Sequence, residues 1–263
     1  MIKEEFSVLF AHVDDLCARA ERGELGATRF LSPKEQYALS VYLNSHGFRG
    51  RYIVFGGYVD AERCRVFILP EYIENAETYG DISPYIEDKP ISAIRIVGSG
   101  YRKLTHRDFL GSLLALGIER DVVGDIVVRS GEKDEAVVFC DGVIEEFLLA
   151  ELKRIANDAV KTETFTVSDD FVSERRFLHI SDTVASARLD CIVAAICSLS
   201  REKARAAIIS GLVEVNFENE TAPDKNLSVP AVVSVRGYGK FRINSVSDIT
   251  RKGRLRLDAD KYL

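Results

Sequence analysis

Four cationic side chains lie close together in the last third of the sequence and have the chemistry to bind a polyanion. They are Arg188, Arg201, Lys203 and Arg205. Arginine can hold a pair of phosphate oxygens with its forked guanidinium group, whereas lysine offers a point charge. These residue types therefore indicate contacts to the phosphates of a nucleic-acid backbone rather than bond making or breaking.

Two short helices are expected to position these cations. Apolar residues at positions 189, 192, 193 and 196 recur at the spacing of one helix face. Ser200 then has the hydroxyl group of an N-cap for a second helix, and Gly211 follows the last packed residue, where a left-handed backbone is needed. The two helices form a compact platform for polyphosphate, and residues 212–216 alternate as a short strand.

A second group of candidate RNA contacts follows this platform. Asn216 can offer its amide to a phosphate or a 2′-hydroxyl group, and two glycines in residues 236–242 allow close backbone approach. We expect Phe241 to pack in the core and Asp190 to orient a neighbouring arginine. The predicted contacts in residues 236–242 are Arg236, Tyr238, Lys240 and Arg242.

These segments resemble the S-four-type RNA-binding domain, which is named after a small-subunit ribosomal protein. The resemblance rests on R-L-D-(x9)-S-R-x-K-A from residue 188, I-x-x-G-x-V-x-V-N at 208–216 and V-S-V-R-G-Y-G-K-F at 233–241. It implies an S-four-type (αL) RNA-binding domain over residues 181–263, with Ser200 and the cations named above on its RNA surface.

The middle of the chain has the element order of a split β-α-β plait. RNA-recognition modules share this order, but they stack bases on exposed strand aromatics, and these strands offer only Phe139. The pattern therefore predicts an RRM-like fold over residues 81–168 without establishing RNA binding. The predicted elements are strands at 91–97, 125–129, 136–139 and 163–167 and helices at 105–116 and 141–156.

One stretch of this segment is similar to the middle domain of the bacterial YlmH family. It is G-S-G-Y-R-K-L-T-H-R-D-F-L-G-S-L-L-A-L-G-I-E-R at residues 98–120, followed by G-D-I at 124–126. The glycines free the backbone before a helix, and cations beside its N-terminus could hold a second phosphate. These cations are Arg102, Lys103 and Arg107. The alternative is a glycine-permitted connection with solvated charges.

The first part of the chain predicts a small α/β domain over residues 1–80. Ser32-Pro33-Lys34-Glu35 has the pattern of a capping box with proline at the first helical position. The expected elements are helices at 3–21 and 33–44 and a hairpin of strands at 51–58 and 63–69.

The YlmH resemblance implies that these parts follow one another in one α+β protein. Residues 169–180, with mixed charges and no clear period, are the predicted linker between the central and C-terminal domains. A hinge there would let the C-terminal module orient independently of the rest of the chain.

The charge distribution fits a local nucleic-acid footprint. The formal charge of the whole chain is −6, but residues 180–263 hold 13 Lys and Arg against 10 Asp and Glu. That module therefore carries +3, and the remainder carries −9. Five cysteines without a C-x-x-C pair predict reduced thiols and no zinc site, and no other metal or cofactor is expected. The absence of a signal-peptide pattern or a long apolar run predicts a cytoplasmic protein without membrane contact.

The YlmH resemblance implies a role in ribosome-associated quality control. In that role the S-four-type domain contacts ribosomal RNA and tRNA on a large ribosomal subunit that is obstructed by peptidyl-tRNA. It helps to hold the tRNA while a tail is added to the stalled chain. We therefore expect a non-catalytic, monomeric RNA-binding protein without a small-molecule substrate.

Two other functions stay open from the sequence. One is an RNA-modifying or RNA-cleaving enzyme with an unrecognised N-terminal site, although no catalytic motif is present and the four histidines are isolated. The G-R-L-D motif of pseudouridine synthases is also absent, because Ala187 precedes Arg188-Leu189-Asp190. The other is a protein-interaction adaptor linked to cell division, which the acidic majority of the chain favours.

Overall fold

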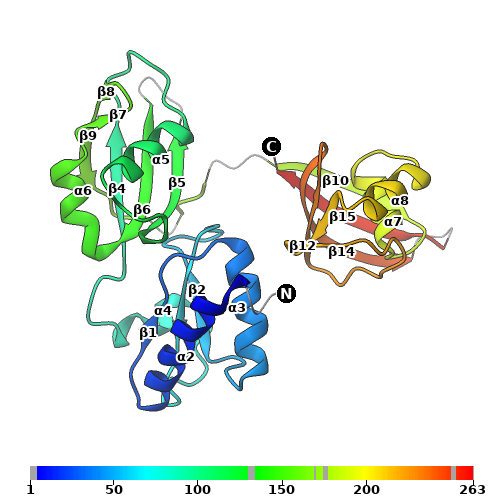
Figure 1. The fold of residues 1–263 in the computed structure, drawn as a ribbon, viewed down its shortest axis with the longest axis horizontal. Coiled ribbons are helices and arrows are strands. Elements are labelled where there is room, and N and C mark those ends of the chain that lie inside the picture. Colours follow the sequence, from blue (N-terminus) through cyan, green and yellow to red (C-terminus); the bar gives the residue numbers. More distant parts are fainter. Residues whose placement is uncertain (1–4, 130–133, 169, 174–176, 250–252, 263) are drawn as a thin grey trace. The chain divides into compact units, whose positions relative to one another are not determined.

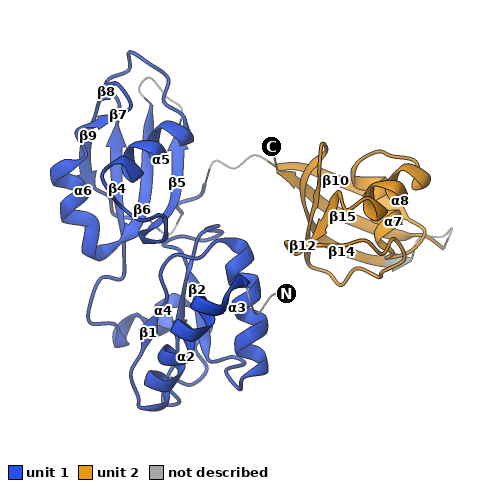
Figure 2. Cartoon of the chain, in the orientation of Figure 1, with its two compact units in different colours: residues 1–174 blue, residues 175–263 orange. Residues whose placement is uncertain are grey.

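The chain combines helices with several sheets and divides into two compact units, residues 1–174 and 175–263 (Figures 1 and 2). The computed structural model describes residues 5–129, 134–168, 170–173, 177–249 and 253–262. The middle of the predicted linker, including Arg175 and Arg176, lies outside these ranges.

The first part of unit 1 packs two helices on a small antiparallel sheet. Ser32 caps the second helix as predicted: its backbone N–H donates to the Glu35 carboxylate at 2.7 Å, and its hydroxyl oxygen accepts from the Glu35 N–H at 3.4 Å. Strand order is β1-β3-β2, which contains the predicted hairpin and one additional strand. The elements are α2 (Ser7–Glu21), β1 (Gly26–Ala27), α3 (Pro33–Ser45), β2 (Tyr52–Phe55), β3 (Arg65–Ile68), α4 (Tyr79–Ile82) and η1 (Ser83–Tyr85).

The second part of unit 1 contains a four-stranded antiparallel sheet in the order β5-β6-β4-β9. Along the chain, its main elements follow the predicted order β-α-β-β-α-β. Phe109, Leu113 and Leu148 are buried in one core with the strands. The elements are β4 (Ile91–Val97), α5 (His106–Ala115), η2 (Arg120–Val122), β5 (Val123–Arg129), β6 (Glu135–Asp141), η3 (Gly142–Ile144), α6 (Glu145–Glu151), β7 (Arg154–Ile155), β8 (Asp158–Ala159) and β9 (Lys161–Thr164).

The helix predicted at 141–156 is wrong at both ends. Asp141 ends β6, and a turn of 3-10 helix precedes α6, which stops at Glu151. The chain then forms the β7–β8 hairpin, in which Ala156 has φ of 50°. Leu152 is buried just after the helix, whereas Phe147 is 43% exposed.

Aromatic side chains cover the sheet face that RNA-recognition modules leave open. Phe139 on β6 is fully buried, with Tyr58 and Phe171 at ring-centroid distances of 4.8 and 5.6 Å. The predicted linker over residues 169–180 is too long at its start, because the side chain of Phe171 packs on this sheet. The far end of that stretch is structured as well, since β10 begins at Phe177.

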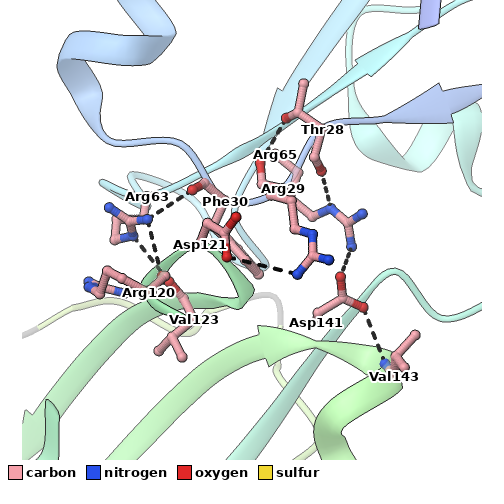
Figure 3. A network of polar contacts seen from close by, with 10 residues as sticks. All are labelled: Thr28, Arg29, Phe30, Arg63, Arg65, Arg120, Asp121, Val123, Asp141 and Val143. Atoms are coloured by element: carbon pink, nitrogen blue, oxygen red, sulfur yellow. Dashed lines mark hydrogen bonds and ion pairs between the residues drawn. The ribbon is translucent and has the colours of Figure 1, made fainter. Parts of the chain in front are cut away.

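A network of arginines joins the two parts of unit 1 (Figure 3). Arg63 donates to the carbonyl oxygens of Phe30 at 2.8 Å and Val123 at 3.1 Å. Arg65 forms an ion pair with Asp141 at 3.1 Å. Burial, with repulsion from Arg63, lowers the pKa of Arg120 to about 10. These cations satisfy internal acceptors, so they hold the hairpin to the central sheet rather than offering charge to a partner.

Unit 2 packs two helices on one face of a six-stranded antiparallel sheet in the order β10-β15-β14-β13-β11-β12. Phe241 is buried in this core, as predicted, together with Ala204 and Ile208 of the second helix. The elements are β10 (Phe177–Val184), α7 (Leu189–Ile196), α8 (Arg201–Ile209), β11 (Val213–Val215), β12 (Glu218–Asn219), β13 (Ala231–Val235), β14 (Gly239–Ile249) and β15 (Leu255–Tyr262).

Candidate nucleic-acid interface

Three of the predicted arginines converge on one buried carboxylate in unit 2. Arg188 donates to both oxygens of Asp190, from Nε at 3.2 Å and from Nη2 at 3.1 Å. Arg201 Nε and Arg205 Nη1 reach Asp190 Oδ2 at 3.1 and 3.3 Å. We call Arg188, Asp190, Arg201 and Arg205 the Asp190 cluster. The prediction that Asp190 orients a neighbouring arginine understated its role, because it holds arginines from both helices.

Local sequence explains how Asp190 reaches this position. It is the second residue of α7, and its backbone N–H donates to the Pro223 carbonyl oxygen at 2.9 Å. Ser200 caps α8 as predicted: its hydroxyl oxygen accepts from the Lys203 N–H at 3.3 Å. The cap sets the start of α8 so that Arg201 and Arg205, one turn apart, face the same side of the helix. Ser200 therefore contributes to the site by fixing where α8 begins. Its hydroxyl oxygen already accepts a hydrogen bond from that helix.

The Asp190 cluster carries excess positive charge at the surface. Asp190 is fully buried, but the side chains of Arg188, Arg201 and Arg205 are 32%, 53% and 46% exposed. Burial alone would raise the pKa of the Asp190 carboxyl group, but hydrogen bonds from Arg188 and Arg201 outweigh it and hold that pKa well below its usual range. The carboxylate therefore stays ionised and neutralises only one of three guanidinium charges. Lys203 is also exposed on α8, so this surface is suited to phosphates.

The predicted contacts on β14 lie on the other side of the sheet. Side chains alternate along a strand, and Phe241 and Ile243 point into the core beneath α7 and α8. Lys240 and Arg242 therefore point to the opposite face. There Lys240 Nζ lies 4.9 Å from the centroid of the Tyr262 ring, and Arg242 donates to Asp260 at 3.1 Å. Strand alternation therefore separates these two cations from the Asp190 cluster, and their RNA contacts stay predictions.

The three remaining candidates of unit 2 lie in turns or at a strand end. Asn216 has φ of 49°, and its side-chain oxygen accepts from the Val232 N–H at 2.9 Å, so its amide stabilises the turn after β11. Arg236 and Tyr238 are exposed in the turn between β13 and β14. Their RNA contacts stay predictions.

The predicted second phosphate site is crowded by carboxylates. Arg102 forms an ion pair with Asp108 at 3.0 Å, and Asp108 also closes the capping box of α5 with Thr105. In the preceding loop, Asp158 accepts from the Ser99 N–H and Asp134 from the Leu104 N–H. These contacts lower the positive potential at the helix N-terminus. Lys103 and Arg107 remain exposed on the surface.

The same loop contains one further candidate, which sequence patterns alone do not single out. Tyr101 is 96% exposed beside Arg102 and Lys103. An aromatic ring flanked by cations is the combination that stacks on unpaired bases while phosphates bind nearby. The signal was present in Y-R-K at 101–103, but an exposed tyrosine cannot be distinguished from a packed one without the fold.

A family model and a curated protein are both similar in sequence to this chain. Residues 84–169 match the family described as the putative RNA-binding domain in YlmH. The chain is 28% identical over 242 residues, 92% of its length and 89% of the relative's, to the ribosome-associated protein quality control protein P2 of Bacillus subtilis (strain 168). The resemblance to the YlmH family is confirmed.

The chain also aligns with one solved structure of a protein from another bacterium. The cell division protein ylmH from Streptococcus pneumoniae aligns with a TM-score of 0.45 and 22% identity, covering 65% of this chain and 93% of that one. Within the described ranges, no helix is both long and apolar enough to cross a bilayer. In the same residues, no group of three or more His, Cys, Asp or Glu side chains is arranged to hold a metal ion.

Proposed function

We propose that this YlmH relative is a non-catalytic RNA-binding factor in ribosome-associated quality control. In this proposal it acts in the cytoplasm as a monomer on the large ribosomal subunit, where it contacts ribosomal RNA and tRNA and stabilises peptidyl-tRNA on obstructed subunits. Unit 2 acts as the S-four-type domain, and the central sheet with α5 and α6 acts as an RRM-like domain.

The Asp190 cluster carries the proposal. Its three guanidinium groups are fixed in direction by one buried carboxylate, yet each remains about one-third to one-half exposed. Prior orientation lowers the entropy that an arginine loses on binding phosphate. The matched family of putative RNA-binding domains and the name of the Bacillus subtilis relative support RNA and the ribosome as the source of those phosphates.

The central domain contributes through its exposed loop in this proposal. Tyr58 and Phe171 cover the sheet face around Phe139. Tyr101, Lys103 and Arg107 therefore offer the better RNA surface of this domain, with Tyr101 stacking on an unpaired base.

Sucrose-gradient sedimentation of tagged protein from cell lysate tests the ribosomal role. We expect migration with free large subunits at low salt and release as the salt concentration rises, because phosphate contacts dominate binding. Replacing Arg201 and Lys203 together by alanine should abolish co-sedimentation. Arg188 and Arg205 still hold Asp190 in this variant, so its circular dichroism spectrum should remain that of the folded protein.

Three outcomes would contradict the proposal. Protein that stays at the top of the gradient at every salt concentration would remove the ribosome as a partner. Unchanged co-sedimentation of the double variant would move the interface away from the Asp190 cluster. An altered nucleoside in total RNA after incubation with the protein would show that it is an enzyme.

A further inference from the structure

A pocket adjoins the Asp190 cluster within unit 2. Its volume is about 470 Å³, within the range of pockets that hold small ligands. It lies between β10, α7 and the turn that leads into α8. Arg201 belongs both to its lining and to the cluster, so the pocket and the cluster share one side chain.

The lining combines a small apolar surface with cations. Ala194 and Ala195 of α7 and Leu199 of the turn form the apolar part. Arg201 uses Nε to hold Asp190, and its side chain is 53% exposed. Arg254 is oriented by Thr183, whose hydroxyl oxygen accepts from its Nε at 3.0 Å. Two guanidinium groups therefore flank a surface that suits the face of a planar ring.

One carboxylate completes the pocket. Asp182 accepts from the Thr183 N–H through Oδ1 at 2.6 Å, and this contact fixes the direction of the carboxylate. Such a group accepts a hydrogen bond from an exocyclic amino group but repels a carbonyl oxygen. Cytosine carries an amino group at the position where uracil carries a carbonyl oxygen.

We propose that this pocket binds one unpaired nucleotide of an RNA strand that lies on the Asp190 cluster. The inference rests on the proposed RNA-binding function and adds the form of RNA that is bound. The base contacts Ala194 and Leu199, and its phosphate binds Arg201 and Arg254. Asp182 selects cytosine over uracil. A base held in a duplex cannot enter, because its neighbours on both faces are stacked bases.

The test compares a blunt RNA duplex with the same duplex that carries an unpaired tail of cytidines or uridines. Fluorescence anisotropy with the full-length protein measures each affinity. For the unsubstituted protein, we expect the cytidine tail to raise affinity about tenfold over the blunt duplex, as base contacts of this kind do. The uridine tail should give a smaller gain. No gain from either tail would overturn the inference.

Two variants and one control locate the effect. Ala194→Phe fills the pocket without changing charge, so the gain from the cytidine tail should be lost while affinity for the blunt duplex stays within twofold. Ala150→Phe adds the same ring at an exposed position of α6 in unit 1 and should keep the gain. Asp182→Asn retains the size of the side chain and should remove the preference for cytidine even if Ala194→Phe does not fold. A retained gain in a folded Ala194→Phe, or a retained preference in Asp182→Asn, would overturn the assignment.

The remaining outcomes separate this inference from the proposed function. Absence of binding to every RNA, together with absence from the large subunit, means that the proposed function fails and the pocket assignment with it. Binding of all three RNAs with equal affinity overturns the pocket assignment alone. Cytidine monophosphate is the probe for a free ligand. If it binds as tightly as the tailed duplex, the pocket is a mononucleotide site and the RNA assignment is wrong.

Discussion

Arg201 Nε donates to Asp190 Oδ2 at 3.1 Å and so ties the start of α8 to the start of α7. The pair joins a fully buried carboxylate to a guanidinium group that is about half exposed. The buried end fixes the geometry, and the exposed end is available to a partner. The buried Asp190 thus orients the three arginines that form the cationic surface.

Replacing Asp190 by asparagine should destabilise unit 2. The change leaves three guanidinium groups close together without their shared anion, and the new amide turns a donor toward them. Because those groups are partly exposed, we expect a loss of about 2 kcal/mol in the free energy of unfolding, below the cost of breaking a fully buried pair. Urea denaturation measures it. Asp224→Asn removes the same charge at an exposed position and should change stability by less than about 0.5 kcal/mol.

The contribution of Asp190 to the free energy of unfolding should depend on pH only under acidic conditions. Its pKa in the folded protein is well below its usual range, because the hydrogen bonds from Arg188 and Arg201 outweigh burial. A depressed folded pKa gives stability that is fully present above the unfolded pKa of about 4 and is lost as pH falls toward the folded pKa. The difference in stability between unsubstituted protein and Asp190→Asn should therefore stay constant from neutral pH to about pH 5 and shrink below about pH 4. A difference that shrinks near neutral pH would contradict this assignment.

Local features of the fold could be predicted from the sequence because they depend on neighbouring residues. The caps at Ser32 and Ser200 are formed as expected, each by a side chain that meets the backbone three residues later. The strand at Ile91–Val97 has the predicted bounds. The two strands of the N-terminal hairpin also pair as expected.

Relations across the fold could not be predicted in the same way. The sequence identifies Arg188 and Arg205 as cations, but their convergence on Asp190 depends on the packing of α7 against α8. Likewise, Tyr58 and Phe171 pack on Phe139 although the three residues lie far apart in the chain. Hydrophobic periodicity predicts which face of a helix or strand is buried, but it does not predict which other element packs on that face.

Lys203 allows phosphate binding to be tested without disturbing the Asp190 cluster, because it lies outside that cluster and is exposed on α8. Lys203→Ala should weaken binding to all RNA sequences alike and lower the slope of log affinity against log salt concentration by about one. Filter binding over a range of salt concentrations measures the slope. Lys225→Ala, at a lysine paired with Glu220, should leave the slope unchanged. Equal slopes for the unsubstituted protein and Lys203→Ala would remove Lys203 from the interface.

Tyr101 should act through its ring rather than its hydroxyl group. Its side chain is 96% exposed, so Tyr101→Ala should leave the melting temperature unchanged. The same variant should lose about 1–3 kcal/mol of binding free energy for single-stranded RNA, the range seen when a stacking aromatic residue is removed. Tyr101→Phe keeps the ring and should bind like the unsubstituted protein. If both variants lose the same affinity, the hydroxyl group makes the contact and stacking is excluded.

Asp125 should hold unit 1 together through its charge. It is buried on β5 and accepts from the Tyr58 hydroxyl at 2.6 Å and from the Glu62 and Arg63 N–H groups at 2.7 and 3.0 Å. Asp125→Asn replaces one acceptor atom with a donor that faces other donors, so we expect a loss of about 3 kcal/mol in the unfolding free energy of unit 1. Asp88→Asn, at an exposed position of the same unit, is the matched control. Amide hydrogen exchange should show the loss in β2 and β3 while unit 2 keeps its protection, since Tyr58, Glu62 and Arg63 all belong to unit 1. Faster exchange in unit 2 as well would mean that the two units unfold together.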